Sequence, residues 1–506
     1  MIGESWQALS PRGLRVSGIR SLAIAAPVVT VLARVLAGLD WPLWPIVAAT
    51  GGAGVVVVAG ALAYEAARLR ATRWRLTADR LEVRTGVAVR QHRSIPRDRV
   101  RSVDVRADPV RRAFGLTLVK VGTGEHADAH SELVLDSLTG HDAEALRRSL
   151  LRQEAPVADV ALAQLRWAWA RYAPLSVWSF AGGALVLGAL YKTLDLLGLD
   201  LFTSDVAAGV WDWVTGRPWM AVPALLAANA ALGVVGALLL FAESWGRYRL
   251  EREPGRLRLS RGLLTNRSLT LQERRLRGVE ISEPLLLRLG GGARVKAVAT
   301  GLGKAGEDES EDVAALTPPL PRELAVQVAA RVAGMAPVSP SPHPVAARRR
   351  RIVWSLATVA SLAALAAGAT WLAARGGRPA AASGQSWPAG WFWPSLGAAT
   401  ALALPVALWL AADAYRALGH ALSERHLICR RGTLTRRTVA LDRGGIVGWT
   451  LSATVSQRRS GLLTVTATTA AGDGHYDVAD VGRGDGLDLA ARAVPGLLEP
   501  FLVRSQ

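Results

Sequence analysis

Residues 80–121 decide the fold, and they read RLEVRTGVAVRQHRSIPRDRVRSVDVRADPVRRAFGLTLVKV. Apolar residues lie 9, 14 and 17 positions after Gly86, and a second glycine lies 29 positions after it. The same offsets hold after Gly262 and after Gly432. Because five matched positions in three places are very improbable by chance, the pattern indicates a tandem repeat of one unit.

Each copy of this pattern is typical of short antiparallel strands. Runs of four to seven residues alternate apolar and polar side chains, as in Val103-Asp104-Val105, and Gly, Asn or Asp lies at the turns. An amphipathic helix closes the repeat unit, for example the helix that begins near His141 in the first copy. We therefore expect three small β-barrels or sandwiches, each plugged by one C-terminal helix.

The composition indicates a membrane protein. Half of the 506 residues are apolar, and Lys and Arg outnumber Asp and Glu by 60 to 41. The apolar residues come in long uncharged blocks, and basic residues beside such blocks follow the positive-inside rule. We therefore favour the membrane over nucleic acid as the partner of the basic charge. Cys429 is the only cysteine, which excludes an intrachain disulfide.

The apolar blocks pair into three transmembrane hairpins, each followed by a strand-rich domain. Two spans of roughly 20 residues joined by a short turn suit a bilayer, and Arg34, near the far end of the first span, is expected to snorkel to the interface. The predicted boundaries are a tail at 1–20, hairpins at 21–67, 174–242 and 352–415, strand-rich domains at 72–152, 247–333 and 420–502, and a Pro- and Arg-rich linker at 334–351.

The positions of the basic residues predict the orientation. The turn of the first hairpin has no Lys or Arg, the second loop has Arg217 alone, and the third has Arg375 and Arg378. Clusters of three or more basic residues lie at the opposite ends of the spans. The domains and both termini are therefore expected in the cytoplasm, with the spans in the plasma membrane.

The second helix of each hairpin ends with an acid and an arginine about one turn apart. This spacing permits a local ion pair at the membrane surface, which we favour over transport chemistry. The pairs are Glu65 with Arg68, Glu243 with Arg247, and Asp413 with Arg416.

No catalytic or cofactor-binding motif is present. The chain has no P-loop, Rossmann fingerprint, zinc-protease motif or nucleophile elbow. His126 and His130 fit a solvated hairpin tip better than a metal site, and Glu307–Asp312 fits a solvated acidic loop. We therefore expect no enzyme activity, no cofactor and no metal.

One group of arginines could contact anionic lipid. Near the bilayer each could contribute about 1 kcal/mol, whereas the alternative is a solubilising face that discourages strand pairing. The candidates in the first domain are Arg90, Arg93, Arg97, Arg99 and Arg101.

The quoted stretch resembles the bacterial pleckstrin-homology-like (PH-like) domain, in particular that of YdbT-type membrane proteins, where such domains alternate with transmembrane hairpins. The resemblance rests on a strand pair around a glycine, an Ile-Pro, a basic and apolar strand, and Arg-x-x-Gly-Leu. In the first copy the matching positions are Gly86, Ile95, Pro96, Val100, Val103, Arg111 or Arg112, Gly115 and Leu116. The other copies depart from it, with Gln272 and Asp442 where proline would stand.

The resemblance implies a seven-stranded barrel capped by a helix, which is a binding or scaffolding fold. Fold alone does not settle function. The expected role is a non-enzymatic scaffold that contacts the lipid bilayer and other membrane or cytoplasmic proteins, with an oligomer left open. The alternative is a six-span transporter or channel component with regulatory PH-like domains, although ionisable residues lie mainly at the ends of the spans.

Overall fold

The computed structural model describes residues 5–87, 89–100, 102–122, 132–150, 160–176, 188–189, 191–194, 204–300, 314–335, 339–375 and 392–498. The chain forms two compact units. The first holds Met1–Leu276 and Gly301–Leu320, and the second holds Arg277–Thr300 and Pro321–Gln506.

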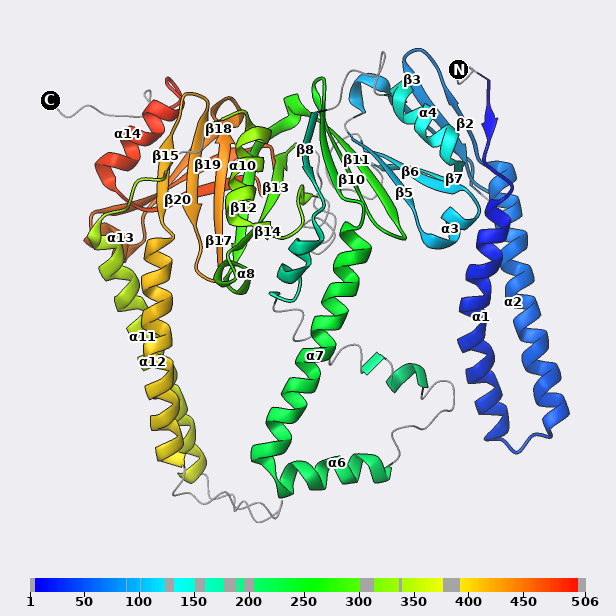
Figure 1. The fold of residues 1–506 in the computed structure, drawn as a ribbon, viewed down its shortest axis with the longest axis horizontal. Coiled ribbons are helices and arrows are strands. Elements are labelled where there is room, and N and C mark those ends of the chain that lie inside the picture. The colour runs from blue at the N-terminus through cyan, green and yellow to red at the C-terminus, as the bar shows by residue number, and fades with distance from the viewer. Residues whose placement is uncertain are drawn as a thin grey trace. The chain divides into compact units, whose positions relative to one another are not determined.

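The first unit begins with a helical hairpin, α1 (Gly13–Ala37) and α2 (Leu43–Ala71). The two helices lie side by side (Figure 1). Helix α1 begins earlier than the expected start of the span at residue 21, because the helix continues from the apolar run into the basic segment before it. The preceding tail also adds a short strand, β1 (Gln7–Ala8), to the edge of the first sheet.

The second strand of this first sheet follows α2 directly in the chain. Its order is β1-β2-β3-β4, and all its pairs are antiparallel. The other three strands are β2 (Arg73–Leu76), β3 (Arg80–Thr85) and β4 (Gln91–Pro96), and the 3₁₀ turn η1 (Arg97–Arg99) follows them.

A second antiparallel group completes the first domain. Trp74, Leu81, Val119 and Leu146 are buried together, so both sheets and the closing helix share one core. The elements are β5 (Ser102–Ala107), α3 (Pro109–Ala113), β6 (Leu116–Gly122), β7 (Glu132–Thr139) and α4 (Gly140–Leu150).

The middle segment contributes its first strands to this same unit, and helices α6 (Ser204–Gly216) and α7 (Pro218–Trp245) lie between the first and the second of these strands in the chain. Strand β11 pairs with β5, so one seven-stranded sheet runs in the order β7-β6-β5-β11-β10-β9-β8. We call the β5–β11 pairing the first joint. The added strands are β8 (Val160–Gln164), β9 (Arg249–Glu253), β10 (Arg256–Arg261) and β11 (Asn266–Gln272).

The second unit contains a matching joint. The remaining elements of the middle segment are β12 (Leu276–Pro284), α8 (Leu285–Leu289), β13 (Gly292–Ala299) and α10 (Arg322–Ala333). Strand β12 pairs with β17, which gives the sheet order β14-β13-β12-β17-β16-β15. We call this the second joint. The other strands are β14 (Leu320–Pro321), β15 (Gly419–Leu422), β16 (His426–Arg431) and β17 (Thr435–Asp442).

The last segment closes the chain with its own three-stranded sheet, β18-β19-β20. The pair of long helices α11 (Val345–Arg375) and α12 (Phe392–Arg416) precedes the segment (Figure 1). The closing elements are β18 (Ile446–Ser452), α13 (Val455–Arg459), β19 (Leu462–Thr469), β20 (His475–Gly482) and α14 (Arg483–Ala493).

The three anchor glycines of the sequence pattern share one backbone conformation. Gly86, Gly262 and Gly432 have φ of +119°, +110° and +117°. A Cβ on Gly432 would lie 1.9 Å from the carbonyl oxygen of Thr435, so a side chain cannot fit in this turn. The pattern therefore marks the same tight turn in all three segments.

Among the described residues, five helices are long and apolar enough to cross a membrane. They are Gly13–Ala37, Leu43–Ala71, Pro218–Trp245, Val345–Ala369 and Leu396–Arg416. The expected first span of the second hairpin, residues 174–194, lies mostly outside the described part of the chain. The helices fit a membrane protein. The sequence led us to expect three separate barrels, but the two joints show that strands of different segments share one sheet.

Candidate functional site: the junctions between helices and sheets

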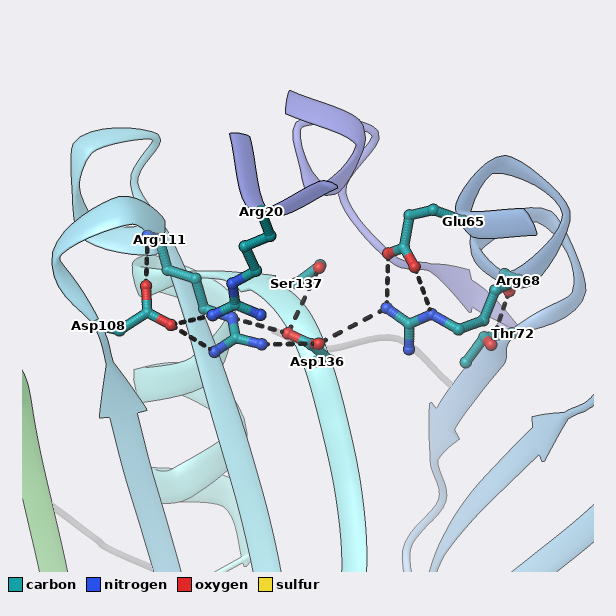
Figure 2. A network of polar contacts seen from close by, with 8 residues as sticks. All are labelled: Arg20, Glu65, Arg68, Thr72, Asp108, Arg111, Asp136 and Ser137. Atoms are coloured by element: carbon teal, nitrogen blue, oxygen red, sulfur yellow. Dashed lines mark hydrogen bonds and ion pairs between the residues drawn. The ribbon is translucent and has the colours of Figure 1, made fainter. Parts of the chain in front are cut away.

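A network of charged side chains lies where the first hairpin meets its domain (Figure 2). Arg111 donates from Nε and Nη2 to the two carboxylate oxygens of Asp136 at 3.0 and 2.8 Å. Its Nη1 donates to Asp108 at 2.7 Å. Arg20 of α1 also donates to Asp108, so the network reaches from the sheet to the first helix.

The second helix joins the same network through Arg68. This guanidinium donates to Glu65 one turn earlier at 2.7 Å and lies 3.6 Å from Asp136 of β7. Thr72, the residue between α2 and β2, donates to the backbone oxygen of Arg68 at 2.8 Å. Figure 2 shows the acids and the arginines in a row between the helix ends and the strands.

This geometry suits side chains that orient the domain on its helices better than side chains that catalyse a reaction. Asp108, Asp136 and Glu65 each accept from an arginine, and the bidentate contact of Arg111 fixes both partners in a plane. In the described residues, no group of three or more His, Cys, Asp or Glu side chains could hold a metal ion. The network links the domain to both helices of its hairpin.

The second unit has a junction of the same kind, centred on Asp480. Arg350 and Arg351 of α11 donate to this carboxylate at 2.6 and 3.0 Å, and Gln457 donates at 2.9 Å. Asp480 is only 1% exposed. It has a left-handed backbone, φ +59°, at a bulged strand, as Ser137 has in the first domain with φ +62°.

A histidine pair lies beside this second junction. His343 and His420 face each other at 3.0 Å between ring nitrogens, and Tyr415 donates to the backbone oxygen of His343 at 2.9 Å. Nδ1 of His343 lies 3.2 Å from the backbone oxygen of Asp480. Burial, together with the neighbouring His420, lowers the pKa of His343 to about 4.

The structure corrects part of the expected ion pairing at the ends of the second helices. The pair of Glu65 with Arg68 is confirmed. Glu243 instead accepts from the backbone N–H groups of Leu264 and Thr265, at 3.0 and 2.9 Å, because it caps the turn of its own domain.

Asp413 likewise contacts a helix and a strand of the second unit and not its neighbour Arg416. Its carboxylate oxygens lie 2.6 Å from Arg288 of α8 and 3.4 Å from Arg436 of β17. Spacing along one helix identified the acids, but residues outside that helix supply the partners of Glu243 and Asp413.

The five candidate lipid-binding arginines do not share one place. Arg90 lies exposed after the Gly86 turn, at the end of the sheet where α2 enters. Arg97 and Arg99 lie in η1 at the opposite end, where Arg97 donates to the backbone oxygens of Ala78 and Ser149. Arg93 lies between these ends in β4.

Arg101 is outside the described residues, as are His126, His130 and the acidic run 307–312. Contact between these arginines and anionic lipid stays a prediction.

The two joints carry a shared arrangement that the sequence did not reveal. In the first joint Ser102 lies opposite Leu271, and in the second joint Gly278 lies opposite Leu441. Each residue can be numbered by its distance from the anchor glycine of its own segment. In both joints the residue at position 16 of one segment then lies opposite the residue at position 9 of the next. The second joint also brings Glu280 to 3.7 Å from Arg437.

Comparison with known families matches the model of the bacterial PH domain at residues 22–154 and 355–494. These two regions each contain a helical hairpin and the strand-rich segment that follows it. No curated protein matches the chain. No solved structure matches it either.

Proposed function

Because the chain belongs to the bacterial PH domain family, we propose that it is a non-enzymatic scaffold of the plasma membrane that binds proteins through its PH-like domains. In this proposal the middle segment is a third PH-like domain, three hairpins anchor the chain, and the domains lie in the cytoplasm. The shared turn conformation of Gly86, Gly262 and Gly432 supports three copies.

The observation that carries the proposal is the pair of joints. Each joint is a ladder of antiparallel backbone pairing between strands of two different segments, six residue pairs long in the first and seven in the second. Addition of a strand to a sheet edge is a general mode of protein recognition, in which backbone hydrogen bonds give affinity and side chains give selectivity. The edges of this fold are therefore suited to bind other chains.

The charged junctions support the same role. Asp136 and Asp480 connect the last strand of a domain to its hairpin through arginines. A domain held in this way presents its sheet edges at a fixed orientation to the membrane, which reduces the ordering cost of binding.

The proposal is tested by purifying the full chain in mild detergent and identifying stoichiometric partners by mass spectrometry. We expect at least one protein at a constant ratio to the chain. Absence of any such partner, together with solute or ion flux by the chain reconstituted alone in vesicles, would contradict the proposal and support a transporter.

The cytoplasmic placement has its own test. A reporter that is active only outside the cytoplasm, fused after Gln506, should give no signal. A strong signal would contradict the placement.

A further inference from the structure

Among the edge strands in the described part of the chain, two are of the kinds that pair in the joints. The first sheet ends at β4 and the last sheet ends at β18. Strand β4 occupies the place of β11 and β17 in its segment, and strand β18 occupies the place of β5 and β12. The chain therefore leaves one edge of each of the two kinds that pair in both joints.

From these edges we infer that β18 of one copy pairs with β4 of a second copy and forms a third joint between two molecules. This inference deepens the proposed scaffold by naming a partner, and it rests on that proposal. Continuity with two joints of the same construction supports a second copy as the occupant.

The two observed joints fix the register of the third. Their shared rule places position 16 opposite position 9, counted from Gly432 in β18 and from Gly86 in β4. Gly448 should therefore lie opposite Ile95, and Leu451 opposite His92. Register is this strictly set because a slip of one residue turns every side chain to the other face.

The exposure of β18 agrees with an edge that is open in one molecule. Thr450, Leu451 and Ser452 are exposed. At the corresponding positions of β12, Glu280 and Ser282 are buried beside β17 and Ile281 is half-buried. An uncovered β edge is a template for pairing with another chain.

The charged pair of positions that both observed joints share is absent from the two free edges. Position 18 is acidic in both observed joints, Asp104 and Glu280, and position 5 of the facing strand is arginine, Arg267 and Arg437. On the free edges these positions hold the neutral residues Thr450 and Gln91. Both members of the pair are thus replaced together, and the register places Thr450 opposite Arg93.

The short helix beside each joint points to a further contact. Arg112 of α3 donates across the first joint to the backbone oxygen of Leu263 at 2.9 Å. Arg288, at the same position of α8, reaches Asp413 across the second joint. Arg458 holds this position in α13 and is exposed, so it should reach the backbone of Val87 in the second copy.

Such an interface joins two different surfaces, so it is heterologous. Heterologous contacts close into rings when the rotation allows and otherwise extend into filaments. We therefore expect this chain to form closed rings or open filaments in the membrane, and not a twofold dimer.

Cysteine cross-linking of the full chain in membrane vesicles tests the register. The variant His92→Cys with Leu451→Cys should form disulfides between chains and give a series of multimers. The matched control, His92→Cys with Val447→Cys, moves one cysteine four residues along the same exposed edge and should give little product. Background from Cys429 is small because this thiol is buried.

Three results would overturn the inference. The first is equal cross-linking in both variants. The second is no cross-linking in either variant, although all introduced cysteines react with a soluble maleimide and are therefore accessible. The third is a disulfide within one chain at monomer mass. None of these results removes a stoichiometric partner found by purification, so failure here is distinct from failure of the scaffold.

A charge test in the same cysteine background keeps the inference falsifiable. Thr450→Arg places a second cation opposite Arg93 and should lower the cross-linked yield about fivefold, because like charges directly opposite are destabilising. Adding Arg93→Glu should restore the yield. A yield that ignores both changes would contradict the pairing of these strands.

Discussion

Asp480 is the residue on which the second junction depends. It is almost fully buried and accepts hydrogen bonds from Arg350, Arg351 and Gln457. Asp480→Asn should lower the free energy of unfolding by about 3 kcal/mol, because two arginines then lose their counter-charge in a partly buried place.

The measurement is thermal or chaotrope unfolding of the purified chain in detergent. The matched control is Asp488→Asn, whose carboxylate pairs with Arg492 on an exposed face of α14. The control should change the stability by less than about 0.5 kcal/mol. Equal effects of the two substitutions would contradict the structural role of Asp480.

Because the pKa of His343 is lowered, we expect the stability of the last segment to fall in acid. Its pKa in the folded chain is about 4, below the usual value of about 6.5 for an unfolded chain. The unfolded chain therefore binds the proton first, so the stability is present above about pH 6.5 and is lost as the pH falls towards about 4.

Unfolding measured between pH 7 and pH 4 tests the effect of His343. His343→Gln should flatten the loss of stability in this range by about 2 kcal/mol after allowance for solvent access. An unchanged pH profile would show that other groups control the acid response.

The sequence identified the arginines of the junctions better than their acids. Arg111 lies at a position of the family pattern, and its role in the first junction agrees with that. Asp136 and Asp480 belong to strand runs that alternate apolar and polar residues. In such a run the pattern predicts that an acidic side chain faces outward. Only the bulge, with its left-handed residue, turns each of these acids towards the arginines of the helices.

At the scale of elements, the anchor turns should be more sensitive than the second glycines. Gly432→Ala should cost about 3 kcal/mol or more, because its Cβ would overlap the carbonyl of Thr435 and its φ is +117°. Gly461→Ala, in the same segment with φ +65° and no atom within 4 Å, should cost about 1 kcal/mol. Unfolding measurements on both variants compare the two costs, and the reverse order would contradict the turn geometry.

The strands themselves could be predicted, but their partners across the joints could not. Alternation marks β5 and β12 as strands. Alternation says nothing about which edge a strand pairs with, and the resemblance to a closed barrel favoured partners within one domain. Long-range pairing is set by the whole sheet, as the common register of both joints shows.

At the scale of the whole molecule, the composition alone separated the chain into apolar helices and strand-rich segments. The described residues contain five such helices, and both matched family regions begin with a hairpin. The distribution of arginines around the spans predicts the cytoplasmic side, which depends on the insertion of the chain and not on its packing. Binding partners are the part that composition and fold cannot supply.

The central claim is that the strand-rich segments bind one another edge to edge, and one disulfide measurement tests it most directly. Ile281 lies opposite Thr438 in the second joint, so Ile281→Cys with Thr438→Cys should form a disulfide within a single chain. Ile281→Cys with Thr435→Cys moves one cysteine three residues, about 10 Å, and should not. Mass spectrometry of the digested, unreduced protein should find the first linkage in nearly every chain, and its absence, or equal linkage in both variants, would contradict the account.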